Sequence, residues 1–182
     1  MQITDLALPG VKLVHLKVHG DGRGFFMESY KEGDWRPILG DRAFIQDNQS
    51  LSAQVGTVRG LHYQMPPFTQ AKLVQALRGR ILDVAVDLRR NSTTFGRHVA
   101  VELAAGDGRQ LFVPEGFAHG FMTLEPDSMV AYKVTERYEP KSERGVAWDD
   151  PDLAIAWPRG DSVTLSDRDR RWPRLKDLTD LF

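Results

Sequence analysis

The sequence has 182 residues, of which 41% are hydrophobic and 27% charged, with 24 Lys and Arg against 25 Asp and Glu. The net charge of −1 argues against nonspecific binding to nucleic acid, and no apolar run reaches the roughly 18 residues of a membrane span. The absence of cysteine excludes disulfide bonds, thiolate metal sites and a cysteine nucleophile. We expect one domain over residues 1–182, located in the cytoplasm, because Asp5, Pro9 and Gly10 interrupt any signal-peptide pattern.

The first half of the chain predicts strands and one short helix. Residues 11–18 alternate imperfectly and predict an edge strand, whereas residues 29–39 predict a helix. Residues 72–77 predict a strand that a turn at 78–80 joins, as a hairpin, to a second strand at 81–88. This second strand has the clearest period of two in the sequence, with four aliphatic side chains on one face.

The second half continues the pattern of short alternating segments separated by turn residues. Residues 98–103 predict a strand, and the glycine-rich turn at 106–108 leads into another at 110–113. Residues 129–138 alternate once more, and the last ten residues could form a helix. The whole pattern predicts an all-β fold, a sandwich or barrel with minor helices.

Two of the five histidines have neighbours that suggest chemistry. His15, His19 and His98 are interpreted as surface or packing residues. His62 lies in the segment Arg-Gly-Leu-His-Tyr-Gln at 59–64. His119 ends a Pro-x-Gly-x-x-His segment at 114–119, which resembles the second motif of cupins, where this histidine is often a metal ligand.

The first cupin motif, which supplies a His-x-His pair and a carboxylate, is altered in this sequence. The pair reads His62-Tyr63-Gln64, and Lys72 lies in the region where the carboxylate is expected. Glutamine is a poor ligand for transition metals, and a nearby cation repels a metal ion. We therefore favour chemistry without a metal or other cofactor. A metal-dependent cupin that uses His62, Gln64 and His119 remains an alternative, as does a non-catalytic sugar-nucleotide binder.

A histidine, a lysine and a tyrosine can together invert a carbon centre beside a ketone. Imidazole suits proton abstraction near neutral pH, and a lysine ammonium stabilises the enolate oxygen that forms. A tyrosine on the opposite face can return the proton. From spacing alone, however, we favour the interpretation that Lys72 is a solvated strand residue and Tyr132 a core aromatic.

Seven segments in order and near register resemble the dTDP-4-dehydrorhamnose 3,5-epimerase family, over about residues 3 to 175. They are residues 21–26, 46–50, 59–64, 83–89, 114–121, 148–151 and 165–169. The resemblance implies a metal-free, cupin-like jelly-roll barrel that forms a homodimer. It also implies inversion of carbons 3 and 5 of dTDP-4-dehydro-6-deoxy-D-glucose, which gives the precursor of dTDP-L-rhamnose. A relative that inverts only one of these carbons, on a related dTDP-4-keto-deoxysugar, remains an alternative.

The same resemblance implies a role for each candidate catalytic residue. His62 matches the general base, and Asp169 matches the carboxylate paired with it. Lys72 matches the lysine near the ketone oxygen, and Tyr132 matches the general acid. A carboxylate on the second ring nitrogen of a histidine fixes its tautomer and stabilises the imidazolium.

The resemblance also implies a set of substrate-binding positions. These are Arg23, Glu28, Gln46, Asn48, Arg59, His119, Tyr138, Glu143 and Arg168. Two arginines and a histidine of this set match groups that hold the diphosphate and sugar, for which a planar guanidinium is well suited. Tyr138 matches an aromatic that stacks on thymine, and Arg168 stands where lysine is common in the family.

Overall fold

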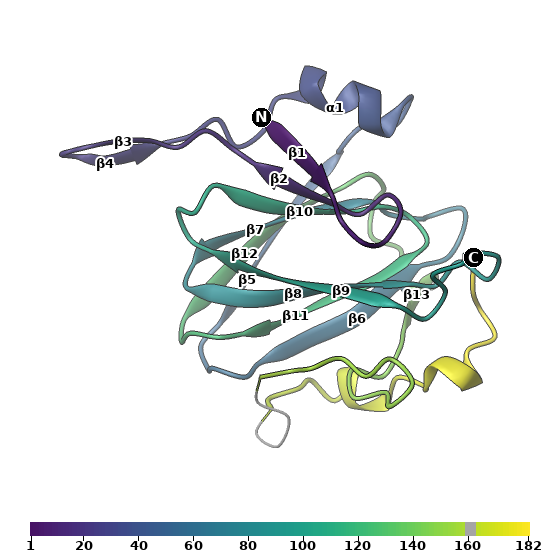
Figure 1. The fold of residues 1–182 in the computed structure, drawn as a ribbon. Helices are drawn as coiled ribbons and strands as arrows, with labels where there is room; N and C mark the ends of the chain where they lie inside the picture. Colours follow the sequence, from purple (N-terminus) through teal and green to yellow (C-terminus); the bar gives the residue numbers. More distant parts are fainter. Residues whose placement is uncertain (159–162) are drawn as a thin grey trace.

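The computed structural model describes residues 1–158 and 163–182 and consists mainly of two facing antiparallel β-sheets (Figure 1). The six-stranded sheet has the order β1 (Gln2–Asp5), β2 (Lys12–His15), β10 (Arg109–Val113), β7 (Lys72–Arg78), β12 (Ser128–Val134), β5 (Gln46–Ser52). The five-stranded sheet has the order β13 (Glu143–Gly145), β6 (Val58–Gln64), β11 (Phe117–Thr123), β8 (Arg80–Asp87), β9 (His98–Ala104). The predicted all-β fold with minor helices is confirmed; the helices are α1 (Glu32–Leu39), η1 (Asp169–Arg171) and η2 (Leu175–Asp177).

The main core lies between the two sheets because alternate side chains of each strand point inward. Val74 and Val130 come from the six-stranded sheet, Ile81 and Phe117 from the five-stranded sheet, and all four are buried in one cluster. Burying an aliphatic or aromatic side chain contributes about 1.5–3 kcal/mol. This core occupies one part of the sandwich and leaves the part beside β5, β6 and β13 for polar side chains.

A second apolar cluster covers the outer face of the five-stranded sheet. Val84, Val86 and Ala118 contribute to it from the strands, and the C-terminal residues Leu178 and Phe182 pack against it. The strand β8 is therefore buried on both faces, although its sequence predicts only one apolar face. The covering segment is the part of the chain that brings η1 to the edge of the sandwich.

The hairpin predicted for residues 72–88 is wrong, since β7 and β8 lie in different sheets. The turn between them passes through Gly79, whose φ of 70° is left-handed. A Cβ atom at this glycine would overlap Ser128, so the chain crosses between the sheets at a point where no side chain fits. A period of two identifies a strand but not its partner.

The helix α1 lies within the predicted range 29–39. Three other features differ from the sequence prediction. The strand β2 is not an edge, because β1 pairs with its other side. The strand β12 ends at Val134, so Tyr138 follows it in a loop. The last ten residues contain only the single turn η2. No helix in the described ranges is long and apolar enough to cross a membrane.

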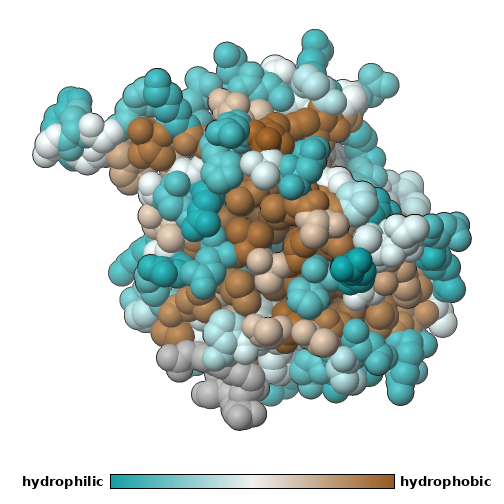
Figure 2. All heavy atoms as spheres, viewed as in Figure 1, coloured by the Kyte–Doolittle hydropathy of each residue, from teal (hydrophilic) through white to brown (hydrophobic). Residues whose placement is uncertain are grey.

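The strands β3 (His19–Asp21) and β4 (Gly24–Phe26) form an arm that projects from the body (Figure 1). The side chains of Phe25 and Phe26 on this arm are exposed, with 58% and 69% of their surface accessible. Figure 2 shows apolar surface on the part of the arm nearer the body. An exposed pair of aromatic side chains is typical of a surface that another chain covers.

Candidate active site

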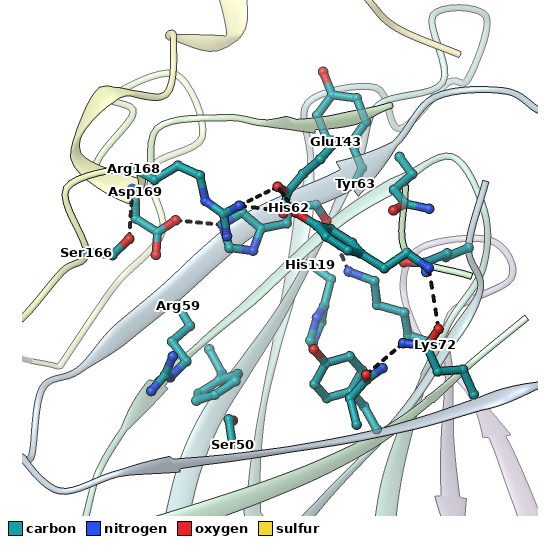
Figure 3. A pocket seen from close by; sticks show the side chains of 17 residues that line it. Ser50, Arg59, His62, Tyr63, Lys72, His119, Glu143, Ser166, Arg168 and Asp169 are labelled. Atoms are coloured by element: carbon teal, nitrogen blue, oxygen red, sulfur yellow. Dashed lines mark hydrogen bonds and ion pairs between the residues drawn. The ribbon is translucent and has the colours of Figure 1, made fainter. Parts of the chain in front are cut away.

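A cavity of about 540 Å³ opens between the two sheets beside β5, β6 and β13 (Figure 3). Side chains from both sheets and from the segment around η1 line it. All but two of the predicted site residues line this cavity. Those that line it are Gln46, Asn48, Arg59, His62, Lys72, His119, Tyr132, Tyr138, Glu143, Arg168 and Asp169. The two exceptions are Arg23 and Glu28, which lie on or beside the projecting arm.

Strand parity explains why residues far apart in the sequence meet in this cavity. His62 on β6 lies opposite His119 on β11, and Tyr132 on β12 lies opposite Asn48 on β5. Directly opposite residues of antiparallel strands have Cβ atoms about 4.5–5.5 Å apart and point to the same face. Lys72 begins β7 with the inward parity of the core residue Val74.

His62 and Asp169 form a close pair at the edge of the cavity. The Nε2 atom of His62 donates to Oδ1 of Asp169 at 2.6 Å. Burial raises the pKa of Asp169, but hydrogen bonds and the nearby imidazole outweigh it, so the pKa lies below its ordinary value. The carboxylate is therefore ionised at neutral pH. Since it occupies Nε2, the ring atom left for a substrate is Nδ1.

Lys72 is a buried cation whose side chain is 7% exposed. Its Nζ donates to the backbone oxygen of His62 at 3.3 Å, and among the described residues it forms no ion pair. Burial lowers the pKa of Lys72 to about 8, against the opposing effect of Asp83 and Glu143. At neutral pH the ammonium is still charged. A buried cation without a close anion is well placed to stabilise negative charge that develops on a ligand.

His119 is paired with Asp83 on the neighbouring strand β8. The Nε2 atom of His119 donates to Oδ1 of Asp83 at 2.8 Å, and both side chains are buried. Burial lowers the pKa of His119 despite this carboxylate, so the ring is neutral at pH 7. A neutral imidazole with Nε2 committed offers Nδ1 as a hydrogen-bond acceptor to the cavity.

Tyr132 lies on the six-stranded sheet, in the other layer from His62. Burial raises the pKa of Tyr132 above its ordinary value. Its hydroxyl is therefore protonated throughout the neutral range and can donate a proton. An acid in one sheet and a base in the other can act on opposite faces of a molecule bound between them.

The outer part of the cavity carries an aromatic ring and two guanidinium groups. The hydroxyl of Tyr138 donates to Oε2 of Glu143 at 2.8 Å, and Arg168 binds the same carboxylate oxygen at 2.5 Å. The ring of Tyr138 is 47% exposed and free to stack on a ligand. Arg59 is oriented by Ser52 and by the backbone oxygen of Leu51, each at 3.0 Å.

The residues of the metal-cupin alternative do not form a metal site. The amide of Gln64 donates to the backbone oxygens of Phe68 and Arg137, and its oxygen accepts from the backbone of Glu139. The Nε2 atoms of both histidines are taken by carboxylates. Within residues 1–158 and 163–182, no three His, Asp or Glu side chains are grouped to hold a metal ion.

Sequence reasoning missed several residues of the site. Asp83 begins a matched segment, and an aspartate between apolar strand residues is a sequence signal for a buried polar partner. Ser166, whose Oγ accepts from the backbone nitrogen of Asp169 at 3.1 Å, carries no pattern of its own. Trp172 lies behind Asp169, and nothing in its sequence neighbourhood predicts that position.

The sequence matches a known protein family over most of its length. The family model described as dTDP-4-dehydrorhamnose 3,5-epimerase matches residues 5–177. The enzyme of that name from Sinorhizobium fredii is 48% identical over 178 residues, which are 98% of this chain and 91% of the relative.

Solved structures of sugar-nucleotide epimerases are also similar to this chain, in both sequence and fold. A dTDP-6-deoxy-D-glucose-3,5-epimerase from Legionella pneumophila, in complex with dTDP-4-keto-L-rhamnose, is 44% identical, with a TM-score of 0.92 over 97% of this chain and 94% of the other. A 3′-monoepimerase from Streptomyces bikiniensis, in complex with dTDP-quinovose, is 35% identical, with a TM-score of 0.87 over 94% and 86%.

Proposed function

The chain belongs to the dTDP-4-dehydrorhamnose 3,5-epimerase family, and from this premise we propose what it does and how. It inverts carbons 3 and 5 of dTDP-4-dehydro-6-deoxy-D-glucose, which gives dTDP-4-dehydro-L-rhamnose. The observation that carries the proposal is the His62–Asp169 pair in one cavity with a buried, unpaired Lys72. Higher identity to the 3,5-epimerases than to the 3′-monoepimerase favours two centres over one.

The first step is removal of a proton from a carbon beside the ketone. Nδ1 of His62 takes the proton, the C–H electron pair forms a carbon–carbon double bond, and the carbonyl π electrons move to oxygen. The ammonium of Lys72, which is buried, stabilises this enolate oxygen. The carboxylate of Asp169 stabilises the imidazolium that results.

The second step returns a proton to the opposite face of the same carbon. Tyr132 supplies it from the six-stranded sheet, and the enolate electrons re-form the ketone. Burial raises the pKa of Tyr132, so the hydroxyl stays protonated and can donate its proton to the enolate. The imidazolium of His62 then loses its proton to water, and the phenolate of Tyr132 takes one from water. The restored pair can act on carbon 5 after carbon 3, since both carbons flank the one ketone.

The outer part of the cavity suits the nucleotide. Tyr138 offers a face for thymine, and Arg59 offers a guanidinium for the diphosphate. His119 accepts a hydrogen bond from a sugar hydroxyl. Gln46 and Asn48, which bond to each other at 2.8 Å, supply further polar contacts from β5.

We also propose that the protein is a homodimer that acts in the cytoplasm. The absence of cysteine suits a reducing compartment. The predicted binding residues Arg23 and Glu28 lie outside the cavity of their own chain, and the arm beside them exposes Phe25 and Phe26. In a dimer, each arm would cover apolar surface on its partner and bring Arg23 to the partner's cavity.

Sedimentation of the purified protein tests the dimer. We expect about twice the 20.6 kDa chain mass at micromolar concentration, because the exposed aromatic pair needs a covering surface. Replacing Phe25 and Phe26 together by serine should shift the distribution towards monomer. A monomer mass for the unaltered protein at all concentrations would contradict the proposal.

Incubation with the 4-keto dTDP-sugar in heavy water tests the activity. We expect NMR to show deuterium at both carbons next to the ketone, together with the inverted product. Prior dialysis against a chelator should leave the rate unchanged, which separates this proposal from a metal-dependent cupin. Tight dTDP binding with no exchange at either carbon would instead identify a non-catalytic binder.

Replacing Tyr132 by phenylalanine should separate exchange from inversion. His62 can still remove and return a proton on its own face, so exchange continues, but product formation falls by about 100-fold or more without the acid. NMR of the same sample follows both processes. Tyr30→Phe, outside this cavity, is the matched control and should leave both rates unchanged. Equal rates of inversion in Tyr132→Phe and the unaltered protein would rule out this role.

A further inference from the structure

Trp172 is the residue behind the catalytic pair for which the proposed function gives no role. It directly follows η1, and its backbone is extended, with φ −62° and ψ 140°. The next residue, Pro173, accepts a backbone hydrogen bond from Ala147 at 2.8 Å. Arg174 then pairs with Asp149 at 2.9 Å. The indole is thus held in place by a chain that is tied down on its C-terminal side.

The indole ring packs directly onto the strand that pairs with His62. Gly145 on β13 lies opposite His62 on β6, and a Cβ atom at this glycine would overlap the ring of Trp172. The ring centroids of Trp172 and His62 are 5.9 Å apart, with the planes at 68°. The indole therefore packs against the imidazole in an edge-to-face arrangement, and it is not among the residues that line the cavity.

The indole also bonds to the oxygen that orients the base. Nε1 of Trp172 donates to Oδ1 of Asp169 at 3.2 Å, and Nε2 of His62 donates to this same atom at 2.6 Å. A carboxylate oxygen that already accepts from an indole has less negative charge available for its second partner. The hydrogen bond from Trp172 is one of those that lower the pKa of Asp169.

We propose that Trp172 is a positioning residue that adjusts the basicity of His62 by sharing Oδ1 of Asp169. The inference rests on the proposed function, because it requires His62 to be the base. The indole fixes the carboxylate and weakens its hold on a proton at His62. Removal of the indole N–H should therefore strengthen the hydrogen bond between Asp169 and His62.

Besides Asp169, other titratable or charged groups also face His62, and the test must leave them unchanged. They are Arg59 on its own strand, Lys72 on β7, Asp83 on β8, His119 on β11, Tyr132 on β12, Glu143 on β13, and Arg168 beside η1. Replacing Trp172 by phenylalanine alters none of these groups. It keeps an aromatic ring beside Gly145 but removes the N–H donor together with part of the ring. Trp157→Phe loses the same part of the ring, so a pH profile that changes only in Trp172→Phe can be assigned to the donor.

The experiment measures kcat/KM for deuterium exchange between pH 5 and 9 in the unaltered protein, Trp172→Phe and Trp157→Phe. We expect the acid limb of the Trp172→Phe profile to move to higher pH by about half a unit, with the plateau within about threefold. Trp157→Phe is the matched control, since it also loses an indole hydrogen bond, to the backbone oxygen of Trp148, but outside the cavity. Its profile should coincide with that of the unaltered protein.

Each outcome decides a separate point. If the unaltered protein exchanges and the acid limb of Trp172→Phe does not move, the inference is overturned while the proposed function stands. If the unaltered protein does not exchange, the proposed function fails and the inference fails with it. A second readout needs no variant and no substrate: the indole N–H resonance of Trp172 should titrate with the midpoint of the acid limb. A resonance that does not change with pH would overturn the inference even if Trp172→Phe failed to fold.

Discussion

Replacing His62 by alanine is expected to reduce deuterium exchange at both carbons by about 1,000-fold or more. General-base catalysis contributes about 10²–10⁴-fold, and in the proposed mechanism both inversions begin with removal of a proton by this one imidazole. His119, which lies opposite it, is not an equivalent base, because it is bonded to Asp83 and its lowered pKa, which burial causes, makes it a weak base. NMR of the keto-sugar in heavy water measures the loss at each carbon separately.

Two measurements show whether this loss is chemical. The affinity for dTDP should stay within about threefold, since Tyr138 and Arg59, which we propose bind the nucleotide, are unchanged in this variant. His98→Gln, on the strand β9 outside the cavity, should exchange at the unaltered rate. Exchange by His62→Ala within tenfold of the unaltered protein at either carbon would mean that another group is the base.

Part of this site could be predicted from the sequence because His62 and His119 have neighbours that suggest chemistry. The roles of Lys72 and Tyr132 came from the resemblance to a family, since spacing alone favoured a solvated lysine and a core aromatic. The same resemblance added Asp169, which no local pattern could join to a histidine 107 positions earlier. That pairing depends on the C-terminal segment wrapping around the sheet, where the residues have no clear periodicity.

Other features depend on long-range packing that a local pattern does not contain. The period of two in β7 and β8 could not show that the chain changes sheets at Gly79. The same holds for burial of β8 on both faces, since its covering residues come from the end of the chain. Arg23 illustrates a third limit, because it lies outside the cavity of its own chain and would reach a binding site only in the proposed dimer.

Lys72 connects the stability of the fold with its proposed chemistry. Burial lowers its pKa from 10.5 to about 8, and one pKa unit corresponds to about 1.4 kcal/mol, so the charged form costs the folded state about 3 kcal/mol. Below pH 8 the lysine is charged in both states and the whole cost applies. Between pH 8 and 10.5 it is neutral only when folded, so the cost disappears as the pH rises. A lysine whose proposed role is to stabilise a developing enolate thus lowers the stability of the folded protein.

Replacing Lys72 by methionine should therefore stabilise the protein while it removes most of the activity. At pH 7 we expect the free energy of unfolding to rise by up to about 3 kcal/mol, and this gain to shrink between pH 8 and 10.5. Exchange should fall by about 100- to 1,000-fold, because the enolate oxygen loses its cation.

The rate of the unaltered protein should also depend on the charge state of Lys72, and therefore on pH. The pKa of Lys72, lowered by burial to about 8, predicts that kcat/KM declines above pH 8, and the residual activity of Lys72→Met should lack this alkaline limb. Lys141→Met, at an exposed turn, is the matched control for both stability and rate. Denaturant unfolding and exchange kinetics on the three proteins are sufficient. A Lys72→Met variant that is less stable at pH 7 would show that the lysine is held by a favourable partner. Its charge would then not be reserved for the substrate, and the electrostatic role proposed for it would fail.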